Sequence, residues 1–221
     1  TTPGTDQPIG TDAAGGTATP ASTSPSTPTA AVDSFANTTA LLSDISGFGK
    51  PYQGASVPGI LTFRGNLTRS YDGTGPIPRT KPRVLWKSPG GGMCGKSSEY
   101  HQIRVWCGTG WTGQPAVFEY KTKTWVVFGA YDYKIHFLDA DTGKAIIPAF
   151  KTGDLAKGNV TIDPNGYPLV YQGSRDNYFR IIAFDGAQPR ELFRQSAVAK
   201  DGLWNNDWDA AALVVGDYLL A

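Results

Sequence analysis

Residues 125–144 read WVVFGAYDYKIHFLDADTGK, and their pattern decides the fold class of the chain. Two runs of β-branched and aromatic residues, 125–128 and 135–138, flank the turn-forming residues 129–132. Another turn signal, DADTG at 139–143, closes the second run. The pattern predicts a β-hairpin, and an isolated hairpin is only marginally stable because it cannot bury its faces. Further strands must therefore pack against it.

Two more hairpin-like stretches, 167–186 and 212–221, supply such strands and indicate a repeat protein. The glycines that this alignment places in the turns are 44 and 43 residues apart: Gly129, Gly173 and Gly216. A period of this length, built from short strands, predicts the four-stranded antiparallel blades of an all-β propeller.

The repeat predicts two complete blades and parts of others. The expected strands of blade one are 116–120, 124–129, 134–138 and a fourth near 145–150. Those of blade two are 160–162, 168–172, 179–184 and 191–194. A lone strand is expected at 84–86 and a turn-rich loop at 90–114. Because propellers close with ~4 to 8 blades, we expect an incomplete fragment that a longer chain or a second chain completes. A small independent domain is the alternative.

Several stretches resemble a known family. GAYD (129–132) and FLDADTGK (137–144) resemble the repeat of the pyrroloquinoline-quinone-like (PQQ-like) β-propellers. FRGN (63–66) and VLWK (84–87) resemble the segment that leads into such a propeller. The resemblance covers 62–221 and implies a bacterial propeller.

The first part of the chain has a different composition. Residues 1–45 are rich in Thr, Ser, Pro and Ala, which predicts a disordered stalk before a folded part at 46–221. Such stalks connect a membrane anchor or cleaved signal upstream of residue 1 to an extracytoplasmic domain; an ordinary linker is the alternative. The net charge is +1 and the basic residues are scattered, which excludes a nucleic-acid footprint.

Cys94 and Cys107 are the only cysteines of the chain. In an exported protein such a pair predicts a disulfide, and two buried thiols are the alternative. No Cys or His pair shows metal-ligand spacing, so we predict no metal site.

The most site-like residues precede the first strand of a predicted blade. They combine amides, a carboxylate and indoles, groups that suit a protein or saccharide ligand at the propeller's loop face. The predicted ligand-binding residues are Trp204, Asn205, Asn206, Asp207 and Trp208, with Trp111 and Gln114 at the corresponding place before blade one. Packing of the tryptophans between blades is the alternative.

Together these features favour a non-catalytic extracytoplasmic propeller that serves as a binding or assembly scaffold. We predict no catalytic residue and no cofactor, since no nucleophile-elbow pattern accompanies the two histidines. The resemblance also permits a PQQ-dependent quinoprotein dehydrogenase with calcium. The adjacent cysteines of those enzymes are not present here, because Cys94 and Cys107 lie thirteen positions apart. A carbohydrate-binding propeller is the remaining alternative.

Overall fold

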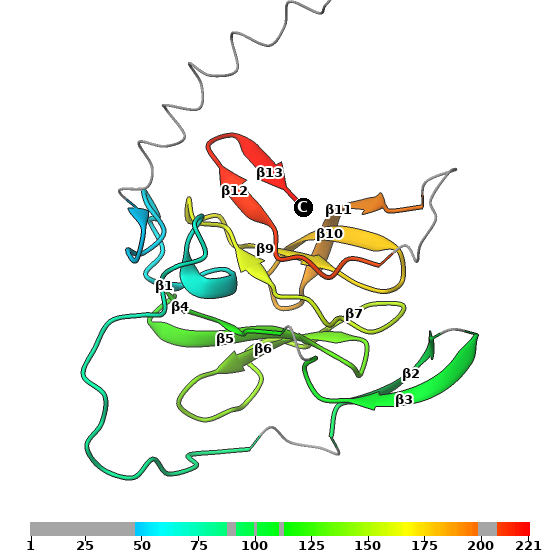
Figure 1. The fold of residues 1–221 in the computed structure, drawn as a ribbon, viewed down its shortest axis with the longest axis horizontal. Helices are drawn as coiled ribbons and strands as arrows, with labels where there is room; N and C mark the ends of the chain where they lie inside the picture. The colour runs from blue at the N-terminus through cyan, green and yellow to red at the C-terminus, as the bar shows by residue number, and fades with distance from the viewer. Residues whose placement is uncertain (1–46, 88–91, 100, 111–112, 199–206) are drawn as a thin grey trace, which may run out of the picture. The chain divides into compact units, whose positions relative to one another are not determined.

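The computed structural model of the chain is all-β, with every strand paired antiparallel to its neighbour (Figure 1). All described residues belong to the unit Leu41–Ala221, so the predicted stalk at 1–45 lies outside them. Within these residues no helix has the length and apolar character needed to cross a membrane. The structure describes residues 47–87, 92–99, 101–110, 113–198 and 207–221.

The first sheet has five strands in the order β1-β4-β5-β6-β7. The central three confirm the strands expected from the sequence, whereas the fourth predicted strand is much shorter. Pro148 lacks the N–H that a continuous ladder needs, so pairing is reduced to a bridge at Ala145 and to β7. The strands are β1 (Gly59–Ile60), β4 (Ala116–Tyr120), β5 (Lys123–Ala130), β6 (Lys134–Asp139) and β7 (Phe150–Lys151).

The second sheet has four strands in the order β11-β10-β9-β8, and it confirms the predicted four-strand meander. A separate two-stranded sheet follows, β12 paired with β13, as the third repeat copy predicts. The bounds are β8 (Thr161–Ile162), β9 (Leu169–Gly173), β10 (Tyr178–Ala183), β11 (Arg190–Ser196), β12 (Leu213–Val215) and β13 (Tyr218–Leu220).

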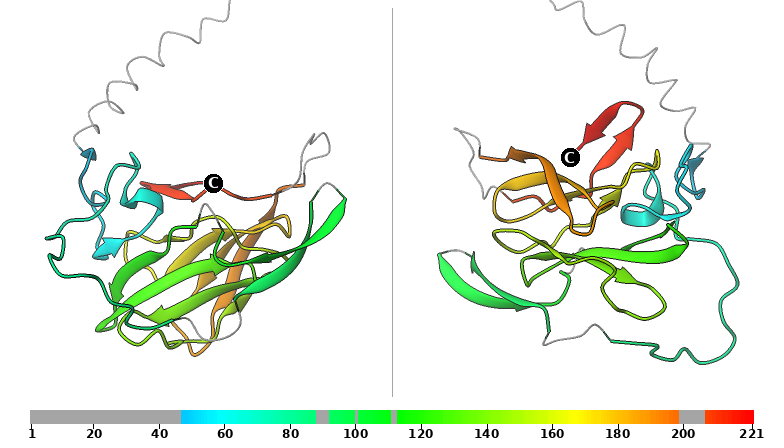
Figure 2. Two further views of the ribbon diagram at one scale, coloured as in Figure 1. Left: turned by 60° about the horizontal axis from the view of Figure 1, so that its bottom comes forward. Right: turned by 180° about the vertical axis from the view of Figure 1, so that it is seen from behind.

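These three sheets stack in chain order, as Figure 1 and the right-hand view of Figure 2 show. Alternate residues of each strand face the neighbouring sheet, so apolar side chains from two sheets meet in one core. The core between the first two sheets includes Phe118, Trp125 and Phe137 on one side and Ile182 and Phe184 on the other. The core between the second sheet and β12–β13 contains Tyr171, Phe179, Ala212 and Val214.

Residues 52–66, the bridging segment, connect the first strands of all three sheets. Gly59 and Ile60 pair with β4, and the carbonyl of Leu61 accepts a hydrogen bond from the Ile162 amide of β8 at 2.8 Å. The Thr62 hydroxyl donates to the Ala212 carbonyl just before β12, at 3.2 Å. Pairing of β1 with β4 was not predicted, because a two-residue strand carries no periodic signal.

The region 90–114, predicted to be a turn-rich loop, instead contains a hairpin. Strand β2 (Cys94–Glu99) pairs with β3 (Gln102–Cys107), and Cys94 lies directly opposite Cys107. These two cysteines form the predicted disulfide. The sequence CGKSSE of β2 has low strand propensity, and burial of Ser97 and Gly95 against the body offsets it.

The predicted strand at 84–86 is wrong. Residues 81–87 form no strand, and the side chains of Val84 and Leu85 are 73% and 68% exposed. Only Trp86 is anchored, since its indole N–H donates to the Ala140 carbonyl at 2.6 Å. No described strand lies beside this segment to complete a ladder.

Two of the three predicted turn glycines lie within strands. Gly129 is in β5 and Gly173 ends β9, and only Gly216 sits in a turn, with a φ of 56°. Gly129 and Gly173 lie near the ends of β5 and β9, whereas Gly216 follows β12, and the physical reason for the first two glycines is not a turn. A Cβ on Gly129 would lie 2.9 Å from the Cβ of Ala156, so close packing of backbone requires glycine there.

Candidate functional site

An open cleft lies where the first strands of the three stacked sheets begin. Gln114, Asn159 and Ala211 each stand two positions before their strands, β4, β8 and β12. All three line this cleft, whose volume is about 510 Å³. Three loops, each leading into a strand of a successive sheet, therefore converge on one place. Among the described residues its lining consists of Phe63, Gly113, Gln114, Asn159, Asp209, Ala210 and Ala211.

Gln114 is fixed by the bridging segment. Its side-chain Oε1 accepts a hydrogen bond of 2.9 Å from the Arg64 backbone amide. Arg64 lies in the short 3₁₀ turn η3 (Phe63–Gly65) and has a φ of 51°, which is unusual for a residue other than glycine. The Gln114 amide group, Nε2, has no hydrogen-bond partner in the described part of the chain. It is thus an oriented donor at the cleft.

Asn159 complements this donor. It is only 4% exposed, and its Nδ2 donates to the Gln114 carbonyl at 3.0 Å. That bond fixes the amide plane and leaves Oδ1 as an acceptor for which the described residues provide no partner. This oxygen is not one of the fully enclosed polar atoms without a partner in the described chain, so water or a ligand can reach it.

Phe63 forms an aromatic wall and is 37% exposed. The guanidinium of Arg69 lies 5.5 Å from the centre of its ring. Arg69 is itself held by the Ala211 carbonyl, to which its Nη2 donates at 2.9 Å. The ring is therefore positioned by a neighbour that contacts another cleft residue.

Asp209 brings a carboxylate to the cleft and belongs to a cluster of charges. The Nζ of Lys157 lies 3.0 Å from Asp209 and 2.8 Å from Asp207, and Arg175 Nε lies 3.3 Å from Asp207. Arg175 also donates to the Ser98 carbonyl of β2 at 2.8 Å. The cluster thus joins four segments beside the cleft: the loop of Lys157, the loop of Asp207 and Asp209, the turn of Arg175, and β2.

The pKa shifts of the cluster follow from burial and pairing. Burial raises the pKa of Asp207, and the nearby Asp209 carboxylate adds to this because it repels a second negative charge. Burial alone would lower the pKa of Lys157, but its hydrogen bonds to Asp207 and Asp209 outweigh that effect and raise it. Both pKa values are therefore raised: burial makes the Asp207 carboxylate harder to ionise, whereas the two carboxylates beside Lys157 favour its protonated form. Lys157 therefore holds Asp209 in place as a firmly charged partner.

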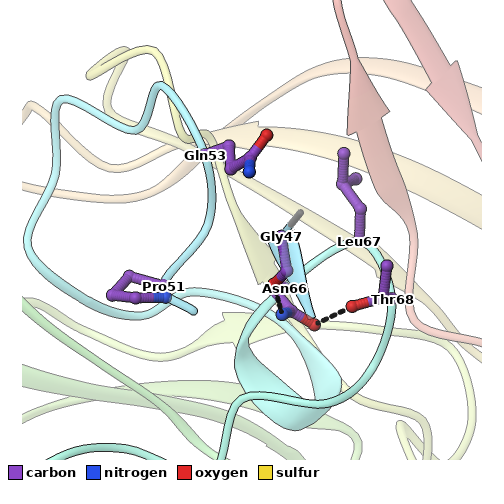
Figure 3. Close-up of a pocket in the computed structure, with 6 residues that line it drawn as sticks. All are labelled: Gly47, Pro51, Gln53, Asn66, Leu67 and Thr68. Carbon is purple, nitrogen blue, oxygen red and sulfur yellow. Dashed lines mark hydrogen bonds between the residues drawn. The ribbon is translucent and has the colours of Figure 1, made fainter. Parts of the chain in front are cut away.

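Other cavities offer weaker sites. A cavity of about 30 Å³ beside Asn66 is too small for a ligand, and the Asn66 side chain is already bonded to Gly47, Lys50, Thr68 and Ser70 (Figure 3). A groove of about 660 Å³ along β1 and β4 is mainly apolar, and its Glu119 and Thr124 are bonded to each other at 2.6 Å. A cavity of about 280 Å³ also has aromatic and polar lining, including Tyr167, Tyr218 and Asp163, but it lies beside β9 and β12–β13 and not where the three loops meet. The cleft of Gln114 and Asn159 combines an aromatic wall with the oriented polar groups described above.

The structure describes three of the seven predicted ligand-binding residues, and each of the three lies in a different environment. Gln114 lines the cleft, and Asp207 lies behind it in the charge cluster. Trp208 packs between sheets, since its ring centre is 5.4 Å from that of Phe179 and its N–H donates to the Asn177 carbonyl at 3.2 Å. Trp111, Trp204, Asn205 and Asn206 lie outside the described residues.

Asn159 and Phe63 were not among the predicted site residues, whereas Asp209 ends the site-like stretch 204–209. Asn159 was detectable, because it lies 45 residues after Gln114 and, like it, two positions before a strand. Phe63 carried no such signal, since it comes from a non-repeating segment that reaches the cleft only through tertiary contacts.

The described residues do not fit PQQ with calcium. Among them no three His, Cys, Asp or Glu side chains come together as metal ligands, and the cleft lining includes a single carboxylate, Asp209. The two cysteines close the base of the β2–β3 hairpin rather than forming a disulfide between neighbours in sequence.

Compared with known proteins, the chain matches no family model and shows no significant similarity to a curated protein. The geometry of the cleft is therefore the basis for assigning a function.

Proposed function

We propose that this chain is part of an extracytoplasmic PQQ-like β-propeller that acts as a non-catalytic binding module, with its ligand in the cleft beside β4, β8 and β12. The observation that carries the proposal is the convergence of Gln114, Asn159 and Ala211 on one cleft, each two residues before a strand of a different sheet. In a propeller the loops on one face of the blades converge, so equivalent loop positions meet.

The sheet arrangement supports the propeller interpretation. Successive antiparallel sheets stack face to face in chain order, and β4, β8 and β12 begin beside one another. Four-stranded meanders at this repeat length are the usual units of that fold. The Cys94–Cys107 disulfide supports an oxidising compartment, where such bonds form and persist.

The chemistry of the cleft suits binding and orientation. Its polar groups are two fixed amides and a carboxylate already paired with Lys157. Groups of this kind discriminate ligands by hydrogen bonding, because an analogue without the matching group leaves them unpaired.

A thermal-shift screen of small polar compounds tests the proposal. We expect at least one compound to raise the Tm of the wild-type chain, as a ligand that binds only the folded state must. The shift should be lost in Gln114→Ala and in Asn159→Ala, and kept in Gln195→Ala, a matched change at an exposed glutamine outside the cleft. Equal shifts in all four proteins would place the binding elsewhere.

PQQ with calcium is a separate arm of the same screen. Stoichiometric, saturable binding of the quinone would overturn the non-catalytic proposal in favour of a quinoprotein dehydrogenase.

A further inference from the structure

The polar groups of the cleft match hydroxyl groups. The Gln114 Nε2 offers a donor, and the Asn159 Oδ1 and the Asp209 carboxylate offer acceptors. A hydroxyl group both donates and accepts, so neighbouring hydroxyls of one ligand can satisfy a donor and an acceptor that stand side by side. The hydrogen bond from Asn159 Nδ2 to the main-chain carbonyl of Gln114 holds the Asn159 side chain against the Gln114 backbone.

One wall of the cleft is aromatic and contrasts with the polar groups described above. Phe63 is 37% exposed at the cleft, and Arg69 holds its ring in place. Small residues, Gly113, Ala210 and Ala211, complete the lining and leave room beside the ring. A flat aromatic surface next to directional polar groups suits a ligand that has an apolar face and a polar edge.

The charge of the cleft favours a neutral ligand. Asp209 is the single charged residue among the described lining residues, and it repels anions. Its charge is already balanced by Lys157 at 3.0 Å, so a cationic ligand would gain little and would compete with that pair. A neutral ligand keeps the ion pair intact.

A peptide fits this cleft less well. An extended peptide is usually recognised along a strand edge, where backbone groups form a ladder. The cleft instead lies at the starts of β4, β8 and β12, and its side chains provide isolated hydrogen-bonding points. Its volume of about 510 Å³ lies within the range of ~300–1,000 Å³ typical of small-molecule sites.

We infer that the cleft binds a neutral saccharide, a mono- or disaccharide unit, with one sugar ring stacked on Phe63 and its hydroxyls bonded to Gln114, Asn159 and Asp209. The inference rests on the proposed binding function and adds the class of ligand. Gln114 and Asn159 select for hydroxyls, and Phe63 supplies the contact area.

A glycan array carrying neutral, uronate-containing and sialylated glycans tests the inference with the full chain. We expect binding to neutral glycans, and competition by free cellobiose, maltose or chitobiose. Calorimetry with the competing disaccharide then compares variants. Phe63→Leu should raise the Kd for the disaccharide about tenfold because the stacking surface is lost, whereas Phe63→Trp should retain the wild-type affinity. Phe48→Leu is the matched control, since Phe48 is 69% exposed and does not line the cleft.

Each outcome of the test is decisive. Neutral-glycan binding that is lost in Phe63→Leu, with an unchanged Tm, supports the inference. Absence of glycan binding, exclusive binding of acidic glycans, or neutral-glycan binding unaffected by Phe63→Leu would overturn it. If a non-saccharide compound instead binds and its effect depends on Gln114 and Asn159, the saccharide is wrong while the proposed binding function stands.

Discussion

At the scale of single residues, glycines and small buried polar groups determine how the cleft is built. A Cβ on Gly158 would lie 2.7 Å from the Asp209 carbonyl, and one on Gly173 would overlap the Cβ of Trp208. The loop that carries Asp209 therefore lies directly on the backbone of the second sheet. This close approach is possible only because neither glycine has a side chain.

Gly173→Ala should destabilise the fold by about 1–3 kcal/mol, because the added methyl group displaces Trp208 from its contact with Phe179. Thermal or urea unfolding measures the change. Gly186→Ala is the control, since the nearest atom to its Cβ would be 3.5 Å away. Equal stability of the two variants would contradict the packing described here.

Tyr52 links the bridging segment to β12 through a buried hydroxyl. Its oxygen accepts a hydrogen bond of 3.0 Å from the Val214 amide, and its O–H donates to the Val214 carbonyl. Burial raises the pKa of Tyr52 from 10.0 to about 12. The folded chain thus holds the phenol proton more tightly than the unfolded chain does.

The unfolding free energy should consequently fall as the pH rises from 10.0 towards about 12. The contribution of Tyr52 is fully present below pH 10.0 and is lost as the pH passes through the folded-state pKa. In Tyr52→Phe the decline should be shallower, and stability at neutral pH should be lower by about 1–3 kcal/mol because Val214 loses its partner. Urea titrations across this range measure both effects. Tyr167→Phe, at an exposed tyrosine, is the control; an unchanged slope in Tyr52→Phe would refute the account.

The sequence pointed to a candidate site residue only where a similar stretch occurs at a corresponding place in another repeat. Gln114 was found because its stretch parallels the one before β12, and Asn159 follows from the same logic. For Trp208 the sequence left packing open as the alternative, because an indole serves equally well in a site and in a core, and its ring lies against Phe179 in the structure.

At the scale of elements, strands with regular alternation were predicted within about two residues, as in β4, β6, β9 and β10. The β2–β3 hairpin was missed because its stability comes from the disulfide and from contacts with residues distant in sequence, which a local sequence pattern does not show. The Lys96 amide, for example, donates to the Tyr133 hydroxyl at 2.6 Å. The reverse error occurred at 84–86, where a good strand sequence has no described strand to pair with.

Reduction of the Cys94–Cys107 disulfide should loosen the β2–β3 hairpin and leave the stacked sheets folded. A loop of this size contributes ~3 kcal/mol through the unfolded state, and the hairpin projects from the body with Ile103 and Val105 exposed (Figure 1). Hydrogen exchange followed by mass spectrometry measures the effect. We expect the largest increase in exchange in 94–107, while β5 and β6 remain protected as parts of a folded sheet. Protein from its native compartment whose two thiols alkylate without reductant would contradict the disulfide itself.

At the scale of the whole molecule, the stack of sheets ends on an apolar surface. The face of β12–β13 that points away from the second sheet carries Val215, Tyr218 and Leu220, which are 36%, 75% and 54% exposed. Its inner face, with Val214 and Leu219, is packed against Tyr171 and Phe179. In a propeller a further sheet, from a longer chain or a second chain, would cover the outer face.

The described chain should therefore self-associate through this face, because exposed apolar strands with open edges are association sites. Sedimentation velocity of the wild-type chain should show concentration-dependent oligomers. The double variant Tyr218→Lys, Leu220→Lys should shift the distribution towards monomer. Ile77→Lys, which replaces an isolated side chain that is 89% exposed, should not. A wild-type chain that stays monomeric at all concentrations would show that this face needs no partner.

In the proposed binding site three loops from successive sheets contact one ligand, and ligand mapping by NMR distinguishes this arrangement from binding elsewhere. The side-chain amide signals of Gln114 and Asn159 report on the cleft itself, and the backbone signals of 113–114, 158–159 and 209–211 report on the three loops. Titration with the compounds that raise the Tm should shift signals from all three loops together, with the same apparent Kd. Shifts confined to a single loop, or to the groove along β1 and β4, would contradict the site.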